Sequence, residues 1–132
     1  MTRPATKRRS TLQQRLIWEV FERSKRPLNA AEVFALARRK RPGIGIATIY
    51  RSIRRMVEEE NLNVVAIPGE TAYYEMADRE HHHYFHCCYC RKVYVIGACP
   101  KVIAELTPPG FVHEHHDIVL HGYCNACKVS SK

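Results

Sequence analysis

Two Cys-x2-Cys pairs restrict the fold of this chain more than any other feature. Cys87 and Cys90 form the first pair, and Cys124 and Cys127 form the second, near the end of the 132 residues. This spacing lets two thiolates on one tight turn face a single cation, and two such pairs complete a tetrahedron. The sequence therefore predicts a closed, structural Zn²⁺ site that ties together a C-terminal module of roughly fifty residues, a size at which a hydrophobic core alone is marginal.

The six cysteines also admit a disulfide framework. The first residues lack the apolar core of a secretion signal, and no apolar run approaches the length of a membrane span. We therefore expect a cytoplasmic protein that is not associated with a membrane, and in a reducing compartment the pattern favours metal ligation. Cys88 is interpreted as a packed thiol that faces away from Cys87, and as the best candidate for a redox side reaction.

The positive charge is confined to one half of the chain. Residues 1–66 carry fifteen Lys and Arg against six Asp and Glu, whereas residues 67–132 carry six against seven. The half without the cysteine pairs thus holds the whole of the net charge of +8. This split indicates a module that binds a polyanion, joined to a separate sensing or assembly module, although a solvated basic surface is an alternative.

Apolar residues at helical spacing predict three helices in the basic half. A polar, basic arm over residues 1–10 is followed by a helix over 12–24, with Thr11 as its N-cap. Asn29 predicts the start of a second helix over 30–40, and a third helix is expected over 47–59.

A hairpin follows these helices, with strands at 63–67 and 71–75 around the turn at Pro68-Gly69. Three helices and a hairpin are typical of a winged helix-turn-helix, and the third helix carries its positive charge on its first turns, where a recognition helix meets DNA.

The rest of the chain predicts a second, smaller module of mixed structure. Strands are expected at 84–88 and 92–96, on either side of the first cysteine pair. A short helix is expected over 100–106, and strand pieces over 111–113 and 117–120. The predicted fold class is α+β, with a winged-helix domain and its basic arm over residues 1–78 and a metal-binding dimerisation domain over residues 79–132.

Several motifs, in order, resemble the ferric uptake regulator family of bacterial metal-dependent repressors. Gly45–Arg51 is similar to the recognition-helix signature of that family. Tyr74-Glu75, the run His81–His83 and the first cysteine pair resemble its central metal region, and Gly122-Tyr123 with the second pair resembles its closing zinc motif. The resemblance runs from about Thr11 to Cys127, and the zinc-responsive branch of the family is one possible place for the chain.

The resemblance implies a regulatory metal site at the positions His81, His83, Cys99 and His116. Three imidazoles and one thiolate suit Zn²⁺ and disfavour harder ions, so zinc is the expected metal, with Fe²⁺, Ni²⁺ or Co²⁺ as alternatives. A small buried residue is the alternative reading of Cys99. A second family site keeps only Glu75 and His82 of its ligands here, so we expect it to be weak or vestigial.

The resemblance further implies a homodimer, formed through the C-terminal module, on an AT-rich inverted repeat of double-stranded DNA. Metal bound near the joint at residues 75–83 is expected to act as corepressor, because it favours one arrangement of the two domains. The arm adds phosphate or minor-groove contacts, and the third helix contacts bases and phosphates. The expected DNA-binding residues are Arg9, Thr48, Tyr50, Arg51, Arg54 and Arg55.

Three other functions compete with this reading. A zinc hydrolase needs an open zinc with a general base, but the chain has no His-Glu-x-x-His pattern, so we expect no catalytic residues, no small-molecule substrate and no enzyme activity. A metal buffer would need no recognition helix and would show no sequence-specific DNA affinity. A peroxide- or thiol-sensing repressor of the same family remains open because of Cys88 and Cys99.

Overall fold

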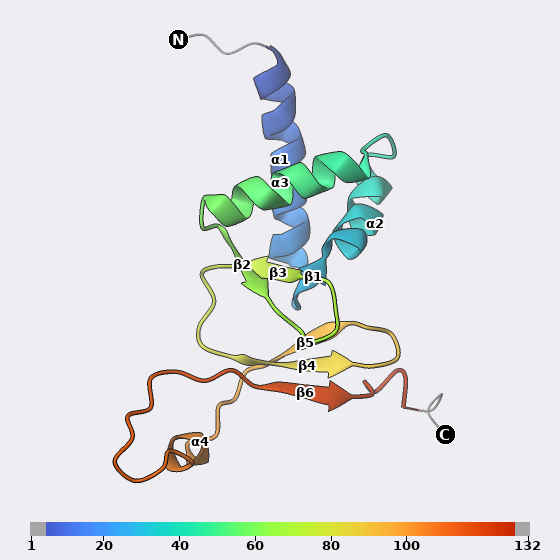
Figure 1. The fold of residues 1–132 in the computed structure, drawn as a ribbon. Coiled ribbons are helices and arrows are strands. Elements are labelled where there is room, and N and C mark those ends of the chain that lie inside the picture. Colours follow the sequence, from blue (N-terminus) through green and yellow to red (C-terminus); the bar gives the residue numbers. More distant parts are fainter. Residues whose placement is uncertain (1–4, 129–132) are drawn as a thin grey trace. The chain divides into compact units, whose positions relative to one another are not determined.

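Three helices dominate the N-terminal part of the chain (Figure 1). The structure is a computed structural model that describes residues 5–128, with side chains from Leu12 onward. The helices are α1 (Ala5–Arg23), α2 (Ala30–Lys40) and α3 (Ile46–Glu58).

The first helix is longer than the sequence predicts. α1 begins at Ala5, so residues 5–10 of the expected arm are helical and Thr11 lies inside the helix rather than at its cap. The cause is composition, because this stretch holds Ala, Lys and Arg, which favour helix, and no glycine or proline. Leu12, an apolar residue of this helix, is 48% exposed.

The second helix begins at the predicted cap. The Asn29 side chain accepts a 2.8 Å hydrogen bond from the Glu32 backbone N–H. In return, the Glu32 carboxylate accepts a 3.0 Å bond from the Asn29 N–H, which completes a capping box. Arg26 donates a 2.8 Å bond to the same carboxylate. These contacts fix the turn that leads from α1 into α2.

The third helix buries one face and exposes the other. Ile49, Ile53 and Met56 are at most 2% exposed. They pack with apolar residues of α1, α2 and the adjoining sheet into a hydrophobic core. The fully buried members include Ile17, Phe21, Leu28 and Val33.

A three-stranded antiparallel sheet follows, with the order β1-β3-β2. Its strands are β1 (Leu28–Asn29), β2 (Leu62–Val65) and β3 (Tyr73–Met76). β2 and β3 form the predicted hairpin, whose turn is closed by a 3.0 Å bond from the Glu70 N–H to the Ile67 carbonyl. Gly69 takes the positive φ of 81° that this turn requires. The sequence missed β1 because two residues carry no strand periodicity.

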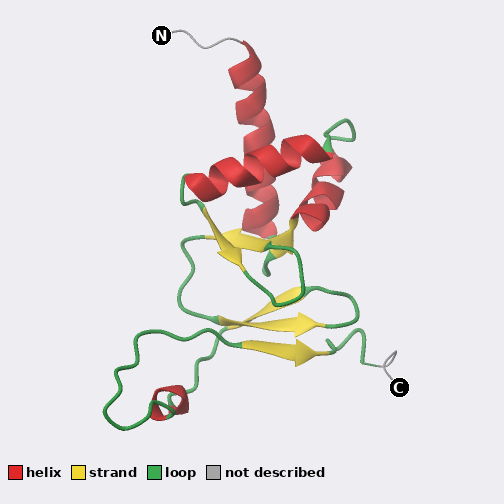
Figure 2. Ribbon diagram, in the orientation of Figure 1, coloured by secondary structure: helices red, strands yellow, loops and turns green. Residues whose placement is uncertain are grey.

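The C-terminal part holds a second three-stranded sheet, with the order β5-β4-β6 (Figure 2). β4 (His83–Cys87) pairs antiparallel with β5 (Val93–Ile96) and parallel with β6 (Val119–Gly122). The helix α4 (Val102–Glu105) is shorter than expected. Residues 111–113 form no strand, and the last strand begins two residues later than expected.

The chain divides into two compact units, residues 1–78 and 79–132. No helix among the described residues combines the length and apolar character needed to cross a membrane.

Candidate metal centres

The four paired cysteines converge at one end of the second sheet. Their sulfur atoms all lie within 4.8 Å of one another, and Cys90 Sγ is 3.9 Å from Cys124 Sγ. Two thiolates bound to one tetrahedral zinc lie about 3.8 Å apart, given Zn–S bonds of about 2.3 Å. The donor set and its spacing therefore fit Zn²⁺. All six cysteines fall in the described part of the chain and are free thiols, so the disulfide alternative finds no support.

Backbone N–H groups prepare this cluster for a thiolate. Burial acts to raise the pKa of Cys87, but backbone hydrogen bonds outweigh it and lower that pKa to about 6. Two of these donors are the N–H groups of Cys90 and Cys124, each 3.4 Å from the Cys87 sulfur. Burial among the other thiols raises the pKa of Cys127 to about 12. Four crowded thiols cannot all ionise without a cation between them, so a bound ion would let the last of them deprotonate.

A second cluster joins four residues from three separate segments. His83 begins β4 and His81 precedes it by two positions, so both side chains extend to the same face. Cys99 comes from the loop after β5, and His116 from the irregular segment before β6. All four were predicted as ligands, and the structure brings them together.

The four ligand atoms form a closed ring of contacts. His81 Nε2 lies 3.1 Å from His83 Nε2 and 3.3 Å from His116 Nε2. Cys99 Sγ lies 3.3 Å from His83 Nε2 and 3.1 Å from His116 Nε2. Two nitrogens on one tetrahedral zinc would be about 3.3 Å apart, and a nitrogen and a sulfur about 3.6 Å. The cluster therefore matches a tetrahedral site closely, with the thiol slightly too near.

Two imidazoles of this cluster, those of His83 and His116, have surroundings that favour the neutral ring. Burial lowers the pKa of His83 from its ordinary value, and the neighbouring His81 lowers it further. Desolvation and the neighbouring His113 lower the pKa of His116. A neutral imidazole offers the lone pair that a metal needs. His113 was not predicted to take part in this cluster. Its Nε2 lies 3.1 Å from His116 Nδ1, so it orients the His116 ring through the nitrogen that does not face the other ligands.

The two remaining family positions do not join a cluster. Among the described residues, no group of three or more metal-binding side chains contains Glu75 or His82. The two ring nitrogens of His82 contact the Glu80 carbonyl and, at 3.0 Å, the Tyr84 hydroxyl. Glu75 is buried in β3. This accords with the expectation of a weak or vestigial site.

A third group was not predicted. His86, Cys88 and His121 place their ligand atoms within 4.8 Å of one another. Cys88 is exposed, so the prediction of a packed thiol at this position is wrong. Strand alternation predicts that the Cys88 side chain points away from that of Cys87. It does not predict whether other residues cover the face to which Cys88 points.

Comparison with known proteins decides which family the chain represents. The model of the ferric uptake regulator family matches residues 5–121. The chain belongs to the ferric uptake regulator family. The Ferric uptake regulation protein of Bordetella parapertussis is 27% identical over 125 residues, covering 91% of this chain and 89% of that protein.

Solved structures from the ferric uptake regulator family share its fold. A zinc-bound manganese uptake regulator superposes with a TM-score of 0.78 at 20% identity, covering 85% of this chain and 87% of the other. FurB of M. tuberculosis, described as a zinc uptake regulator, gives a TM-score of 0.51 at 25% identity, covering 91% and 95%. The predicted fold class is confirmed. Members of the family are metal-responsive regulators of transcription, and they are dimeric DNA-binding proteins rather than enzymes.

Five of the six residues expected to bind DNA lie on α3, the helix that matches the family signature. Tyr50 on α3 is 54% exposed, and Arg51, Arg54 and Arg55 are exposed. Arg51 donates a 3.2 Å bond to the Thr48 hydroxyl, which orients the guanidinium along the helix surface. Arg9 lies in α1, but its side chain falls outside the described side chains.

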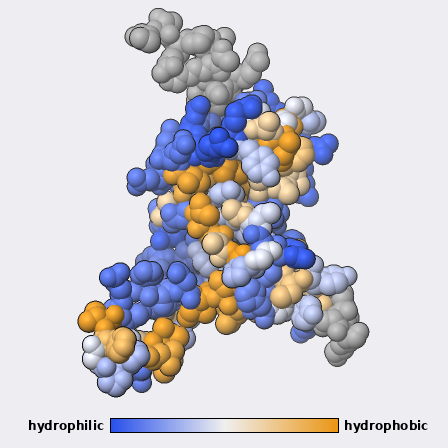
Figure 3. All heavy atoms as spheres, viewed as in Figure 1, coloured by the Kyte–Doolittle hydropathy of each residue, from blue (hydrophilic) through white to orange (hydrophobic). Residues whose placement is uncertain are grey.

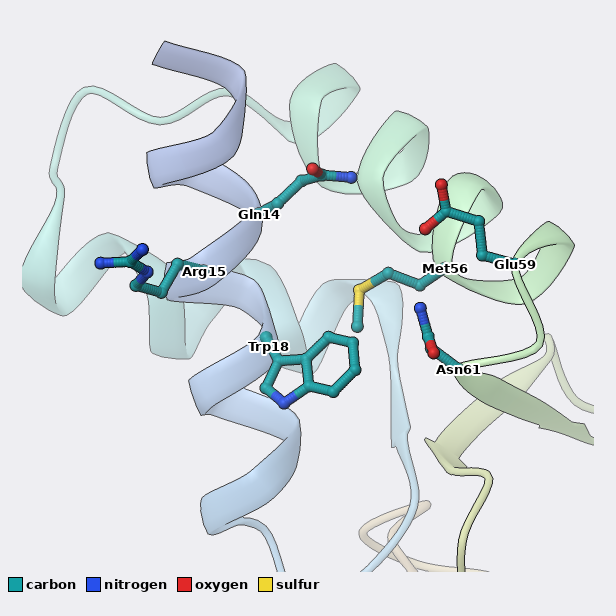
Figure 4. Close-up of a pocket in the computed structure, with 6 residues that line it drawn as sticks. All are labelled: Gln14, Arg15, Trp18, Met56, Glu59 and Asn61. Atoms are coloured by element: carbon teal, nitrogen blue, oxygen red, sulfur yellow. The ribbon is translucent and has the colours of Figure 1, made fainter. Parts of the chain in front are cut away.

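Two hollows lie between α1 and α3 in this unit. The larger, of about 350 Å³, is lined by side chains of α1, by Met56 of α3, and by Glu59 and Asn61 just beyond the end of α3 (Figure 4). The smaller, of about 70 Å³, is polar and lies beside the signature residues. Its lining residues are Gln13, Gln14, Thr48, Arg51, Ser52 and Arg55.

Proposed function

We propose that this protein is a zinc-dependent repressor of transcription that binds DNA as a homodimer, with the metal as corepressor. The observation that carries the proposal is the closed ring formed by three imidazole nitrogens and one thiol. This donor set suits a borderline-soft ion such as Zn²⁺, and it disfavours Mg²⁺ or Mn²⁺, which prefer oxygen ligands. We therefore place the protein in the zinc-responsive branch of the family, with Fe²⁺, Ni²⁺ and Co²⁺ as weaker alternatives.

The two proposed sites have different tasks. Cys87, Cys90, Cys124 and Cys127 would hold a permanent zinc, because four thiolates leave no open position. The ring of His81, His83, Cys99 and His116 is more accessible, since His81 is exposed and only His83 is fully buried. Exchange with the surrounding pool of metal is expected at this second site.

The regulatory residues come from segments with little regular structure of their own. His81 follows the boundary between the two units at residues 78 and 79 by only two positions. Cys99 and His116 belong to the long connection between β5 and β6, which holds the one-turn helix α4. A bound ion would supply the positive charge that holds these three segments together. Residues 81, 99 and 116 would then be ordered mainly in the loaded state, which shifts the population of conformations available to the joint.

The exposed face of α3 would read DNA. Tyr50 is placed to contact thymine methyl groups or backbone, and Arg51 to contact phosphate. Arg54 or Arg55 could reach guanine edges, and the basic start of α1, which carries Arg9, would add phosphate contacts. A two-fold symmetric protein fits an inverted repeat, so we propose an AT-rich operator with one α3 in each half-site.

Exposed apolar side chains support a homodimer formed by the second unit. Val102 is 53% exposed, Leu106 73%, Phe111 70% and Val112 93%. Val102 begins α4 and the other three residues follow this helix, and Figure 3 shows apolar surface in the region of α4. Apolar side chains exposed together on a soluble protein commonly mark a protein–protein interface.

The deciding experiment compares zinc-dependent DNA binding of the wild type and the His81→Ala, His116→Ala double variant. The DNA is a duplex selected from a random pool by the zinc-loaded wild type. We expect the wild type to bind at least tenfold more tightly with zinc, and the variant to bind equally weakly with and without it. His115→Ala is the matched control, because His115 is exposed and contacts only Glu114 among the described ion pairs.

Retention of the zinc response by the double variant would reject the regulatory site. Absence of sequence-specific binding by the zinc-loaded wild type would instead favour a metal buffer. Loss of binding on addition of peroxide to the zinc-loaded protein, reversed by a thiol reductant, would favour the redox-sensing alternative.

A further inference from the structure

His86, Cys88 and His121 form a third cluster, on the face of the second sheet opposite Cys87. His86 and Cys87 are neighbours in β4, so their side chains point to opposite faces of the sheet, and Cys88 lies in the turn directly after this strand. The parallel register pairs His86 with His121 on β6. The Cys88 N–H donates a 2.7 Å bond to the Gly122 carbonyl, which carries the ladder past the end of β4. The backbone thus holds all three side chains side by side.

The nitrogen atoms of this cluster already have the spacing of metal ligands. His86 Nδ1 lies 3.1 Å from His121 Nδ1, and the two rings meet at an interplanar angle of 84°. Two imidazoles on one zinc place their nitrogens about 3.3 Å apart. The Cys88 thiol lies within 4.8 Å of both nitrogens. Because Cys88 is exposed, its side chain can rotate toward the roughly 3.6 Å that a shared zinc requires.

We infer that His86, Cys88 and His121 bind a third zinc ion, through two imidazole nitrogens and one thiolate. Three protein ligands leave the fourth position to water or to an external ligand, as in sites that exchange their metal. Cys88 and His121 are exposed, whereas His86 is buried. This site is therefore weaker and faster to exchange than the two others, and it fills only when zinc is abundant. It does not depend on the DNA-binding role proposed above.

The test is a cobalt titration of the full chain that keeps zinc in its four-cysteine site and has lost its other metal to a mild chelator. We expect the wild type to take up two equivalents of Co²⁺, the second more weakly. Each equivalent adds a thiolate-to-cobalt band, because each site contains one cysteine. Cys88→Ser and His121→Ala each lose the weaker equivalent, and Cys99→Ser loses the tighter one. His115→Ala keeps both.

Two results would overturn the inference. One is a wild type that takes up a single equivalent. The other is a weaker equivalent that survives in both Cys88→Ser and His121→Ala, which would assign it elsewhere. His121 lies exposed on an edge strand, so His121→Ala should keep the fold. This variant therefore remains informative even if Cys88→Ser disturbs the neighbouring four-cysteine cluster. Retention of one zinc per chain after chelation verifies that each variant is folded.

Discussion

His83 Nε2 lies 3.3 Å from the sulfur of Cys99, although a strand and the loop after it separate the two residues. This contact joins a buried strand position to a loop that no regular structure fixes. An ion bound by His83 on the strand would therefore hold the loop in place through the Cys99 thiol.

Replacement of Cys99 by serine should weaken zinc binding at the regulatory site at least tenfold, because a hydroxyl is a poor ligand for Zn²⁺ at neutral pH. Cys99→Asp should restore a four-ligand site and move its preference toward harder ions such as Mn²⁺. Competition with a chelator of known affinity measures both effects. Equal zinc affinity in the wild type and Cys99→Ser would exclude the thiol as a ligand.

Loss of one thiol of the four-cysteine cluster should unfold the second unit. Cys124→Ser leaves three thiolates around the structural ion, and Cys124 is buried, so water cannot readily take its place. We expect loss of the tightly held zinc, detected by metal analysis, and loss of β-structure by circular dichroism. Cys88→Ser is the matched control, since Cys88 directly follows Cys87 of the four-cysteine cluster but lies outside that cluster. A Cys124→Ser protein that keeps one tightly bound zinc and its sheet would contradict the structural role.

Acid should destabilise the protein that lacks regulatory metal. Burial lowers the pKa of His83 below its ordinary value of 6.5, so the unfolded chain binds a proton more readily than the folded one. The contribution of this residue to stability is complete above about pH 6.5 and is lost as the pH falls from there toward the folded pKa. Thermal unfolding midpoints measured between pH 7.5 and 5 should therefore fall less steeply in His83→Gln. A His83 pKa above 6.5, read from the proton resonances of its ring, would refute this sign.

Arg51 should contribute to DNA affinity through phosphate. Arg51→Ala should weaken binding to specific and random duplexes alike, and it should reduce the slope of log affinity against log salt by about 1. Lys101→Ala removes an equal charge from an exposed position in the second unit and should leave the slope unchanged. An unaltered salt slope in Arg51→Ala would show that the Arg51 side chain of α3 does not contact phosphate.

The capping box at Asn29 should contribute to stability independently of any metal. Asn29→Ala removes the side-chain acceptor for the Glu32 N–H and should cost about 1 kcal/mol, measured by denaturant unfolding of the zinc-loaded protein. Asn29→Ser retains an acceptor and should recover most of this loss. Equal destabilisation by serine and alanine would show that the loss arises from the β1–β3 pairing, in which Asn29 also takes part.

Local chemistry made much of this molecule predictable. The bounds of α2 follow from a capping side chain and from a proline beyond its end, both of which act within a few residues. The four-cysteine site is predictable from the sequence because the spacing of each pair places its two thiols on one tight turn. The ring of four regulatory ligands came from the resemblance, since no spacing rule links His81 to His116.

The two failures have different causes. Residues 5–10 were given to an arm because their charge resembles that of a flexible tail, yet their composition supports helix. The cluster at Cys88 depends on which residue of β6 lies opposite His86, and the parallel register fixes that only in three dimensions.

β4 and the residue after it carry candidate ligands of all three clusters within six residues, with His83 and Cys87 facing one side and His86 and Cys88 the other. Sliding this strand by one position along its neighbours would turn every donor atom toward the wrong side. Each ion could thus bind only when the strands pair in the correct register, and its binding would stabilise that register over the others. Metal uptake during folding would act as a proofreading step for the alignment of the strands.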